Sequence, residues 1–231
     1  MNGSSAWMHG VRDGDAAELH AMEFSAGRGV WLMRPKRPAF VLGSSQSADD
    51  IDVKFCAARG IDVARRRSGG GAVFVHPTES VWVDVTIPRG DALWLDDVGR
   101  AMHVVGRAWS EVLDGMGMKN LVVNEGPFVA TEFSKQLCFA GRGSGEVFRV
   151  DDEGNSRDAM TKVIGISQRR TRDVARFQCI GYFAWNIEVH VGAITSLSGG
   201  SNDRPFATPI PLVATNDLLD GLVTALARFS R

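Results

Sequence analysis

The residues with the clearest capacity for chemistry lie in one stretch, Ala64 to Pro77, which reads ARRRSGGGAVFVHP. Its glycines let the backbone adopt positive φ angles and bring bare N–H groups close to a ligand, and its arginines supply fixed positive charge. This combination predicts a cradle for an anion. The alternative is a glycine-rich turn beside a solvated basic edge, because glycines mark turns more often than ligand sites. The spacing differs from both the G-x-x-x-x-G-K-S/T phosphate loop and the G-x-G-x-x-G dinucleotide fingerprint.

The sequence predicts a β-strand on each side of this stretch, and these two strands would hold it in place. Ile61 to Arg66 leads into the glycines, and Ala72 to Val75 leaves them. The next segment, 81–87, alternates aliphatic residues with others up to Pro88, which is the period of a strand with one buried face. From Asp97 to Met116 the apolar residues recur instead at helical spacing, which predicts a long amphipathic helix.

Strands outnumber helices in the rest of the chain, and several neighbours are close enough to form hairpins. The predicted fold is therefore α+β, with a largely antiparallel or mixed sheet and packed helices, in a single domain over residues 1–231. Residues 1–12 are expected to form a flexible arm, and 151–160 an exposed hairpin tip. Further helices are expected at 13–22, 48–59 and 216–229, a hairpin or sharp reversal between strands 30–33 and 39–42, and other strands at 121–123, 136–140, 146–150, 162–168 and 176–185.

Composition limits the classes of function. The net charge of −1 argues against a protein that coats nucleic acid, so the local arginines predict a local anion site. Cys56, Cys138 and Cys179 are far apart in sequence, which favours neither a disulfide framework nor a zinc site and fits a reducing cytoplasm. The chain contains no apolar run long enough to span a bilayer, so we expect a soluble protein with neither membrane nor nucleic acid as a partner.

The arginine and glycine stretch resembles the RRxSGGGAVF signature of the lipoate-protein ligase family, whose fold is shared with biotin ligases and class II aminoacyl-tRNA synthetase catalytic domains. The resemblance implies that this stretch binds the acyl-adenylate. It also extends to a G-x-x-Q after an upstream strand, which makes Gln46 a candidate pocket residue beside the alternative of a solvated loop glutamine. The binding residues implied by the signature are Arg66, Ser68, Gly69, Gly70, Gly71, Ala72, Val73 and Phe74.

A second segment, TKVIGISQRR from Thr161 to Arg170, is similar to the R-K-x-x-G-x-A segment of the same family. The resemblance implies that Lys162 contacts both the acyl carboxylate and the α-phosphate of the nucleotide, and that Gly165 matches the family's glycine. Taken alone, Lys162 would be interpreted as a solvated surface lysine. Ahead of it, Glu146 occupies the position of an acidic residue that would hold Mg²⁺ against phosphate oxygens, which are the hard ligands this ion prefers.

The family resemblance, which runs from about Val30 to Trp185, implies an ATP-dependent lipoate or octanoate ligase. The enzyme would adenylate the acyl carboxylate with ATP and Mg²⁺ and transfer the acyl group to a lysine of a lipoyl carrier domain. Such carriers are of the 2-oxoacid dehydrogenase E2 type or the glycine cleavage H protein type. We expect no accessory C-terminal domain of the kind that some of these ligases have. The depth of an apolar tunnel, which packing sets, would decide between lipoate and octanoate.

Two alternatives remain open. Some octanoyltransferases of the same fold need no ATP and use a cysteine nucleophile in a Cys-Phe pair, and Cys138-Phe139 lies at a similar place; GGGA at Gly69 to Ala72, where those enzymes tend to have GGR-A, favours the ligase. The second alternative is a catalytically silent module that binds an acyl group or adenylate. It arises because VFVHPTES replaces the family's VFHDxGN, and the retention of Lys162 and Arg66 argues against it.

Overall fold

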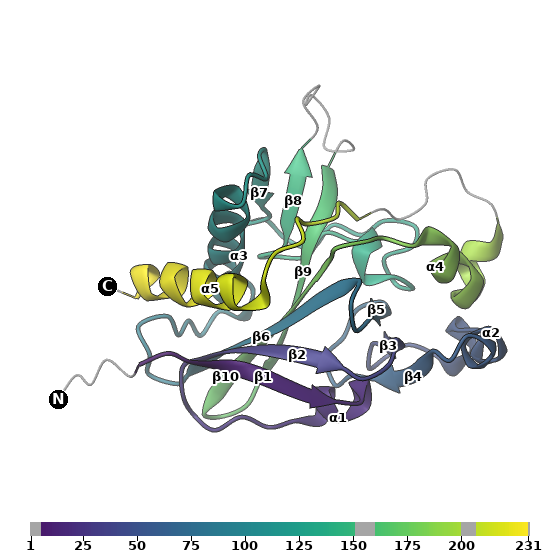
Figure 1. Ribbon diagram of the computed structural model, residues 1–231, viewed down its shortest axis with the longest axis horizontal. Helices are drawn as coiled ribbons and strands as arrows, with labels where there is room; N and C mark the ends of the chain where they lie inside the picture. Colours follow the sequence, from purple (N-terminus) through teal and green to yellow (C-terminus); the bar gives the residue numbers. More distant parts are fainter. Residues whose placement is uncertain (1–5, 151–159, 200–206, 231) are drawn as a thin grey trace.

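The computed structural model describes residues 6–150, 160–199 and 207–230. Its centre is a seven-stranded mixed sheet in the order β1-β2-β6-β10-β9-β8-β7 (Figure 1). Only β1 and β2 pair in parallel among these neighbours, and the other five pairs are antiparallel. The strands are β1 (Met8–Gly14), β2 (Gly29–Pro35), β6 (Ser80–Pro88), β7 (Leu121–Val123), β8 (Val147–Val150), β9 (Met160–Arg170) and β10 (Val174–Tyr182).

A second, three-stranded sheet presents the glycine-rich stretch. It has the order β4-β3-β5, from β4 (Asp62–Arg65), β3 (Ala39–Leu42) and β5 (Val73–Val75). The glycines join β4 to β5, as predicted, but these strands lie on opposite sides of β3 and do not pair with each other. The hairpin expected between 30–33 and 39–42 is wrong, because β2 belongs to the large sheet and β3 to the small one.

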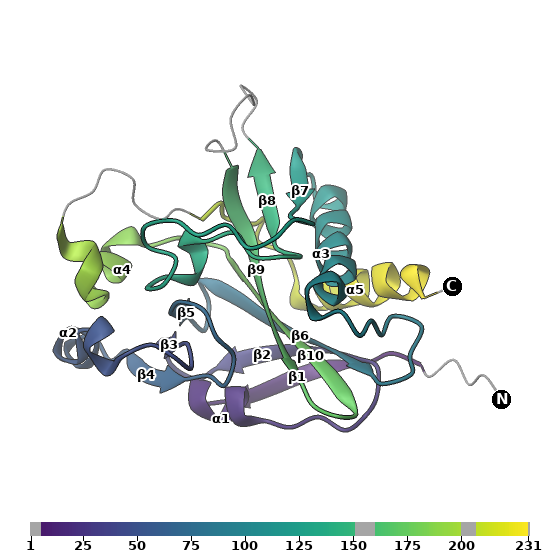
Figure 2. The same cartoon turned by 180° about the vertical axis from the view of Figure 1, so that it is seen from behind.

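Helices cover both faces of the large sheet. On one face, α3 (Val98–Gly115) and α5 (Thr215–Phe229) pack against each other, side by side in both views (Figures 1 and 2). The helix α3 begins where Asp97 accepts a hydrogen bond from the Arg100 N–H, and it buries an apolar stripe that includes Trp109. On the other face, the small sheet packs together with α1 (Ala16–Ala21), α2 (Val53–Ala58) and α4 (Ile187–Ala193).

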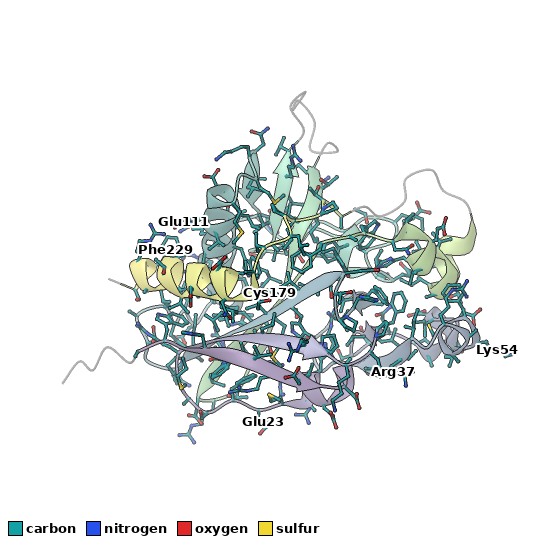
Figure 3. The ribbon with its side chains drawn as sticks, viewed as in Figure 1. Glu23, Arg37, Lys54, Glu111, Cys179 and Phe229 are labelled. Carbon is teal, nitrogen blue, oxygen red and sulfur yellow. The ribbon has the colours of Figure 1, made fainter. Side chains whose placement is uncertain are left out.

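Because both faces of the large sheet are covered, its central strands are buried on both sides. The strand β6 was expected to have one buried face, yet Trp82, Asp84 and Thr86 are buried as completely as the valines between them. Cys179 on β10 likewise lies in the interior, as Figure 3 shows. The polar groups on the second face are therefore buried residues that need partners.

The structure corrects several expected elements. Residues 8–12 of the expected flexible arm belong to β1, which is held by its parallel register with β2. Residues 136–140 form a 3₁₀ turn at Cys138–Ala140, after Leu137 makes a single parallel bridge with Ala72. The helix expected at 48–59 is divided into a 3₁₀ turn at Ala48–Asp50 and α2, and α4 was not predicted. The expected hairpin tip lies outside the described residues, except for Met160.

The chain returns to the large sheet after α4 and a 3₁₀ turn at Thr195–Gly199. Here Ala207 forms a parallel bridge with Lys162, and the Thr208 N–H donates to the Lys162 carbonyl at 2.9 Å. The Ile210 N–H then donates to the Tyr182 carbonyl at 2.7 Å, before the chain enters α5. In the part of the chain that the structure describes, no helix is long and apolar enough to cross a bilayer.

Candidate active site

The glycine-rich loop offers a row of backbone donors. Gly70 has a φ of 96°, a conformation that favours glycine. Among the described residues, no acceptor is found for the N–H groups of Gly69, Gly70 and Gly71. Consecutive N–H groups of this kind form a concave binding site for an anion. The cradle predicted from the sequence thus exists as a geometric feature of the loop.

Arg66 holds the loop in this shape. Its side chain is buried, and one guanidinium nitrogen donates to the carbonyls of Gly69 and Gly71, both at 2.8 Å. Because the peptide group is planar and trans, a carbonyl that faces Arg66 turns the N–H of Gly70 to the opposite side. Arg66 therefore acts on the loop itself, while its Nε has no partner in the part of the chain that the structure describes.

The other two arginines have different environments. Arg65 donates to the carbonyls of Gly43 and Gln46, at 3.0 and 2.6 Å, and so fixes the turn after β3. The Arg67 side chain is 66% exposed and lies 3.9 Å from the Glu23 carboxylate. Arg65 and Arg67 are both exposed, so Arg66 is the buried arginine of the three.

Close packing explains the lack of a side chain at two glycines. A Cβ atom at Gly71 would lie 2.5 Å from the Leu137 nitrogen, and one at Gly43 would lie 1.8 Å from the Gly70 carbonyl oxygen. At Gly69, by contrast, a Cβ would meet nothing within 4 Å. The loop is therefore packed tightly on its protein side and is open at Gly69.

Lys162 on β9 is buried beside this loop. Its Nζ donates to the Glu146 carboxylate at 2.6 Å and to the Cys138 carbonyl at 2.7 Å. The Cys138 N–H in turn donates to the carbonyl of Ala72, at the exit of the glycine loop. An ammonium group has three N–H donors, so one remains for a ligand. The interpretation of Lys162 as a solvated surface lysine is wrong.

Glu146 fits the role of counterion to Lys162 better than that of a magnesium ligand. Besides Lys162, its carboxylate accepts from the N–H of Gly143 at 2.5 Å and from that of Ile166 at 3.3 Å. Among the described residues, no group of three His, Cys, Asp or Glu side chains is placed to hold a metal ion. Gly165 lies next to this pair, where a Cβ would approach Ile180 and Phe139 at 3.3 Å.

The remaining predicted residues surround the loop in different ways. Gln46 is buried and bridges two segments, because it accepts from the Gly43 N–H at 2.9 Å and donates to the Gln136 carbonyl at 3.1 Å. Ser68 lies 3.5 Å from the Ser167 hydroxyl on β9. The Phe74 ring instead packs against Phe40, in the apolar core.

A small cavity adjoins the loop and reveals residues that sequence reasoning missed. It has a volume of about 20 Å³ and is lined by Arg66, Val73 and Ser167, together with His20 from α1 and Gln178 from β10. His20 was part of a predicted helix, but nothing in its spacing set it apart from a surface histidine. Its burial follows from the second covered face of the large sheet.

Comparisons with known proteins agree with this geometry. The family described as the lipoyl protein ligase A/B catalytic domain matches residues 19–205. The chain is similar to the solved structure of the T. acidophilum protein Ta0514 with bound lipoic acid, with 13% identity, a TM-score of 0.65, and coverage of 97% of this chain and 85% of that one. It is also similar to lipoate-protein ligase A bound with ATP, with 14% identity, a TM-score of 0.66, and coverage of 97% of this chain and 85% of that one. For P. falciparum LipL1 in complex with lipoate, the identity is 13%, the TM-score is 0.58, and the coverage is 97% of this chain and 62% of that one. No curated protein matches the chain.

The expected α+β class is confirmed by these folds, which cover nearly the whole chain. The family match covers the second half of α1, the strands β2 to β10, the glycine loop and Lys162, and it leaves outside β1, the first half of α1, and α5 with the segment that precedes it. The chain therefore belongs to the lipoyl protein ligase A/B catalytic domain family.

Proposed function

We propose that this protein is an ATP-dependent ligase that activates lipoate or octanoate as an acyl-adenylate and transfers the acyl group to a lysine of a lipoyl carrier domain. The observation that carries the proposal is the position of Lys162. Its ammonium group is buried, and one of its N–H groups has no acceptor among the described residues. The group is linked through Cys138 to a loop with three backbone N–H groups that also have no acceptor in that part of the chain.

The reaction needs this arrangement because it brings two anions together. An oxygen of the acyl carboxylate attacks the α-phosphorus of ATP, the bond to the β-phosphate breaks, and pyrophosphate leaves. The carrier lysine amine then attacks the acyl carbon and releases AMP. Lys162 and the N–H groups of Gly69, Gly70 and Gly71 supply fixed positive partners for the carboxylate and phosphate oxygens, and a buried site makes such partners effective.

The proposed acid, nucleotide and carrier domain are each supported by what the structures of the relatives contain. Ta0514 is described with lipoic acid, lipoate-protein ligase A with ATP, and a bi-partite lipoate protein ligase of Thermoplasma acidophilum with its E2 lipoyl domain. We propose corresponding partners here, with ATP bringing Mg²⁺ on its phosphates and with E2-type or H-protein-type carriers as acceptors. We place the reaction in the cytoplasm, in line with three free cysteines.

The test follows adenylation directly. The protein is mixed with ATP, Mg²⁺ and lipoate or octanoate, and acyl-AMP and pyrophosphate are measured before an apo carrier domain is added. We expect Lys162→Ala to slow adenylate formation by about 100-fold or more, the loss seen when one preorganised donor is removed. Lys54→Ala on α2, which lies at the edge of the molecule (Figure 3), is the matched control and retains activity. Pyrophosphate release by Lys162→Ala at the wild-type rate would contradict the assigned role.

The transferase remains the second candidate because Cys138 is half-buried and provides the carbonyl that Lys162 contacts. A nucleophilic thiol at this place would form an octanoyl thioester from an octanoyl carrier without ATP. For a ligase we expect no such thioester, and Cys138→Ala keeps most of the ATP-dependent acylation. A thioester on Cys138, together with complete loss of transfer by the alanine variant, would establish the transferase instead.

A further inference from the structure

The cavity beside the glycine loop combines apolar walls with unpartnered polar groups. Val73, Val75 and Ile180 contribute aliphatic surface, and His20 and Arg66 contribute N–H groups. Its volume of about 20 Å³ accommodates about one water molecule, so a longer ligand enters when lining side chains move apart. Aliphatic walls alone would accept any hydrocarbon chain. The selectivity of this cavity for one ligand over another therefore depends on its polar groups.

His20 presents one N–H without an acceptor. Its Nδ1 lies 2.9 Å from the Gln178 side-chain nitrogen, which donates to it, so the proton of the neutral ring resides on Nε2. The residue is 8% exposed, and the residues that the structure describes offer no partner for Nε2. Burial, together with the charges of Arg66 and Arg176, lowers the pKa of His20 well below its ordinary value, so the ring is neutral at pH 7.

Arg66 provides a second buried donor on the same cavity. One guanidinium nitrogen holds the glycine loop, but the Nε–H has no acceptor within the described ranges, and the residue is only 5% exposed. Two buried N–H groups without acceptors on one small cavity are unusual in a folded protein, since nearly all such groups are satisfied. A bound molecule that carries a hydrogen-bond acceptor can satisfy these N–H groups.

The surroundings fix the His20 ring in this orientation. The ring stacks on Trp82 with 4.2 Å between centroids, and the Trp82 Nε1 donates to Asp84 at 2.8 Å. Arg176 binds Asp84 and also donates to the carbonyls of Leu19, His20 and Met22 at the end of α1. The donor is therefore preorganised by packing and by an ion pair.

The distance between the cavity and Lys162 sets the length of the bound molecule. Ser167, which lines the cavity, lies five residues beyond Lys162 along β9 and pairs with Gln178. At about 3.3 Å per residue, Lys162 and Ser167 are separated by about 16 Å along the strand. An acid whose carboxylate is held by Lys162 thus reaches the cavity with the far end of a medium-length chain.

We propose that this cavity receives the far end of the acyl chain, and that His20, assisted by Arg66, selects acids that carry a hydrogen-bond acceptor there over acids that end in plain alkyl groups. The inference rests on the proposed function, because it takes the carboxylate to lie at Lys162. The favoured class is a medium-chain acid with a distal oxygen or sulfur acceptor.

The experiment compares two eight-carbon acids, octanoate and an oxo-octanoate whose keto oxygen is next to the terminal methyl group. Dissociation constants are measured by calorimetry on the full chain at pH 7.5, and adenylation is assayed separately with ATP and each acid. We expect the wild type to bind the oxo acid about tenfold tighter, because its oxygen satisfies a buried donor that octanoate leaves unpaired.

His20→Phe keeps an aromatic ring on Trp82 and removes the donor, so we expect the preference to fall to about one or to reverse. The matched control is His190→Phe: His190 is also buried and stacked, on Trp185 at 3.9 Å, but it does not line the cavity. The control keeps the tenfold preference. Its circular dichroism and that of His20→Phe are compared with the wild type.

The outcomes separate the two proposals. Equal wild-type affinities for the two acids, with adenylates formed from both, would overturn the role of His20 and leave the ligase proposal intact. The wild-type comparison decides this even if His20→Phe does not fold. A retained preference in folded His20→Phe would also overturn it. Failure to form an adenylate with either acid would instead count against the proposed function.

Discussion

Lys162 and Glu146 form an ion pair whose side chains are 1% and 4% exposed, so removing one partner leaves the other as an uncompensated buried charge. We expect Lys162→Met to lower the free energy of unfolding by about 3 kcal/mol. The double variant Lys162→Met, Glu146→Gln should recover much of that loss, yet remain inactive. Urea denaturation with a double-mutant cycle measures the coupling, and additive single effects would show that the pair is not coupled.

We expect alanine substitutions at Gly69 and Gly71 to have different effects on the melting temperature. Gly71→Ala places a Cβ against the Leu137 backbone and should lower the melting temperature before any ligand is added. Gly69→Ala meets no protein atom within 4 Å, so it should melt like the wild type. Any loss of adenylate affinity in Gly69→Ala then reports close approach of the ligand to the loop.

Calorimetric melting and ligand titration of the same preparations give this comparison. Wild-type affinity in Gly69→Ala would indicate that the ligand does not approach the loop at this point. An unchanged melting temperature in Gly71→Ala would contradict the packing role of Gly71.

Residue types singled out the loop as a candidate site because few other purposes need arginines and glycines in that order, whereas Lys162 was proposed only from the resemblance to the ligase family. They did not reveal that Arg66 holds the loop from inside, since a guanidinium suits a carbonyl as well as a phosphate. Nor did they reveal His20 as part of the same cavity, because its role depends on which face of α1 meets the sheet.

At the scale of elements, Arg176 on β10 links the large sheet to α1. Its Nε donates to Asp84 at 2.6 Å, and its other nitrogens donate to three carbonyls at the end of the helix. Burial raises the pKa of Asp84 to about 6, while Arg176 and Trp82 act in the opposite direction. The helix α1 has only six residues, so it depends on this contact.

We expect Arg176→Met to lower the free energy of unfolding by about 3–5 kcal/mol, because Asp84 and the helix carbonyls lose their partner inside the protein. Arg172→Met, at an exposed arginine before the same strand, is the control and should change it by less than about 0.5 kcal/mol. Urea denaturation provides both values. Similar midpoints for the two variants would show that the contact adds little stability.

Long, periodic elements such as α3 and β6 were predictable from sequence, because their patterns persist over many residues. The short segments were harder to predict from the sequence. The 3₁₀ turn at Cys138–Ala140 contains apolar residues that equally suit a strand, and only its contact with the glycine loop determines its shape. The parallel pairing of β1 with β2 involves residues that carry no alternating pattern.

For the whole molecule, buried histidines predict how stability depends on pH. Burial lowers the pKa of His190 to about 4, against the opposing effect of the Asn186 carbonyl. Between pH 6.5 and 4 the unfolded chain therefore binds a proton that the folded chain does not. The stability due to neutral His190 is complete above pH 6.5 and is lost as the pH falls towards 4, by up to about 3 kcal/mol.

His190→Phe isolates this effect, because His20 and Asp84 titrate in both proteins. We expect the stability difference between wild type and variant to be constant above pH 7 and to shift by about 3 kcal/mol in favour of the variant near pH 4. Urea denaturation at several pH values measures it. A difference that does not change with pH would mean that His190 titrates alike in folded and unfolded chains.

The bridge between Lys162 and Ala207 has a consequence for the order in which the site appears during synthesis. The ribosome makes Lys162 well before the segment that pairs with its strand, and at about 5–20 residues per second the delay is on the order of seconds. Until Ala207 and Thr208 emerge, one edge of β9 next to the lysine has no partner from this segment. The surroundings of Lys162 are therefore completed only after the segment around Thr208 has been made.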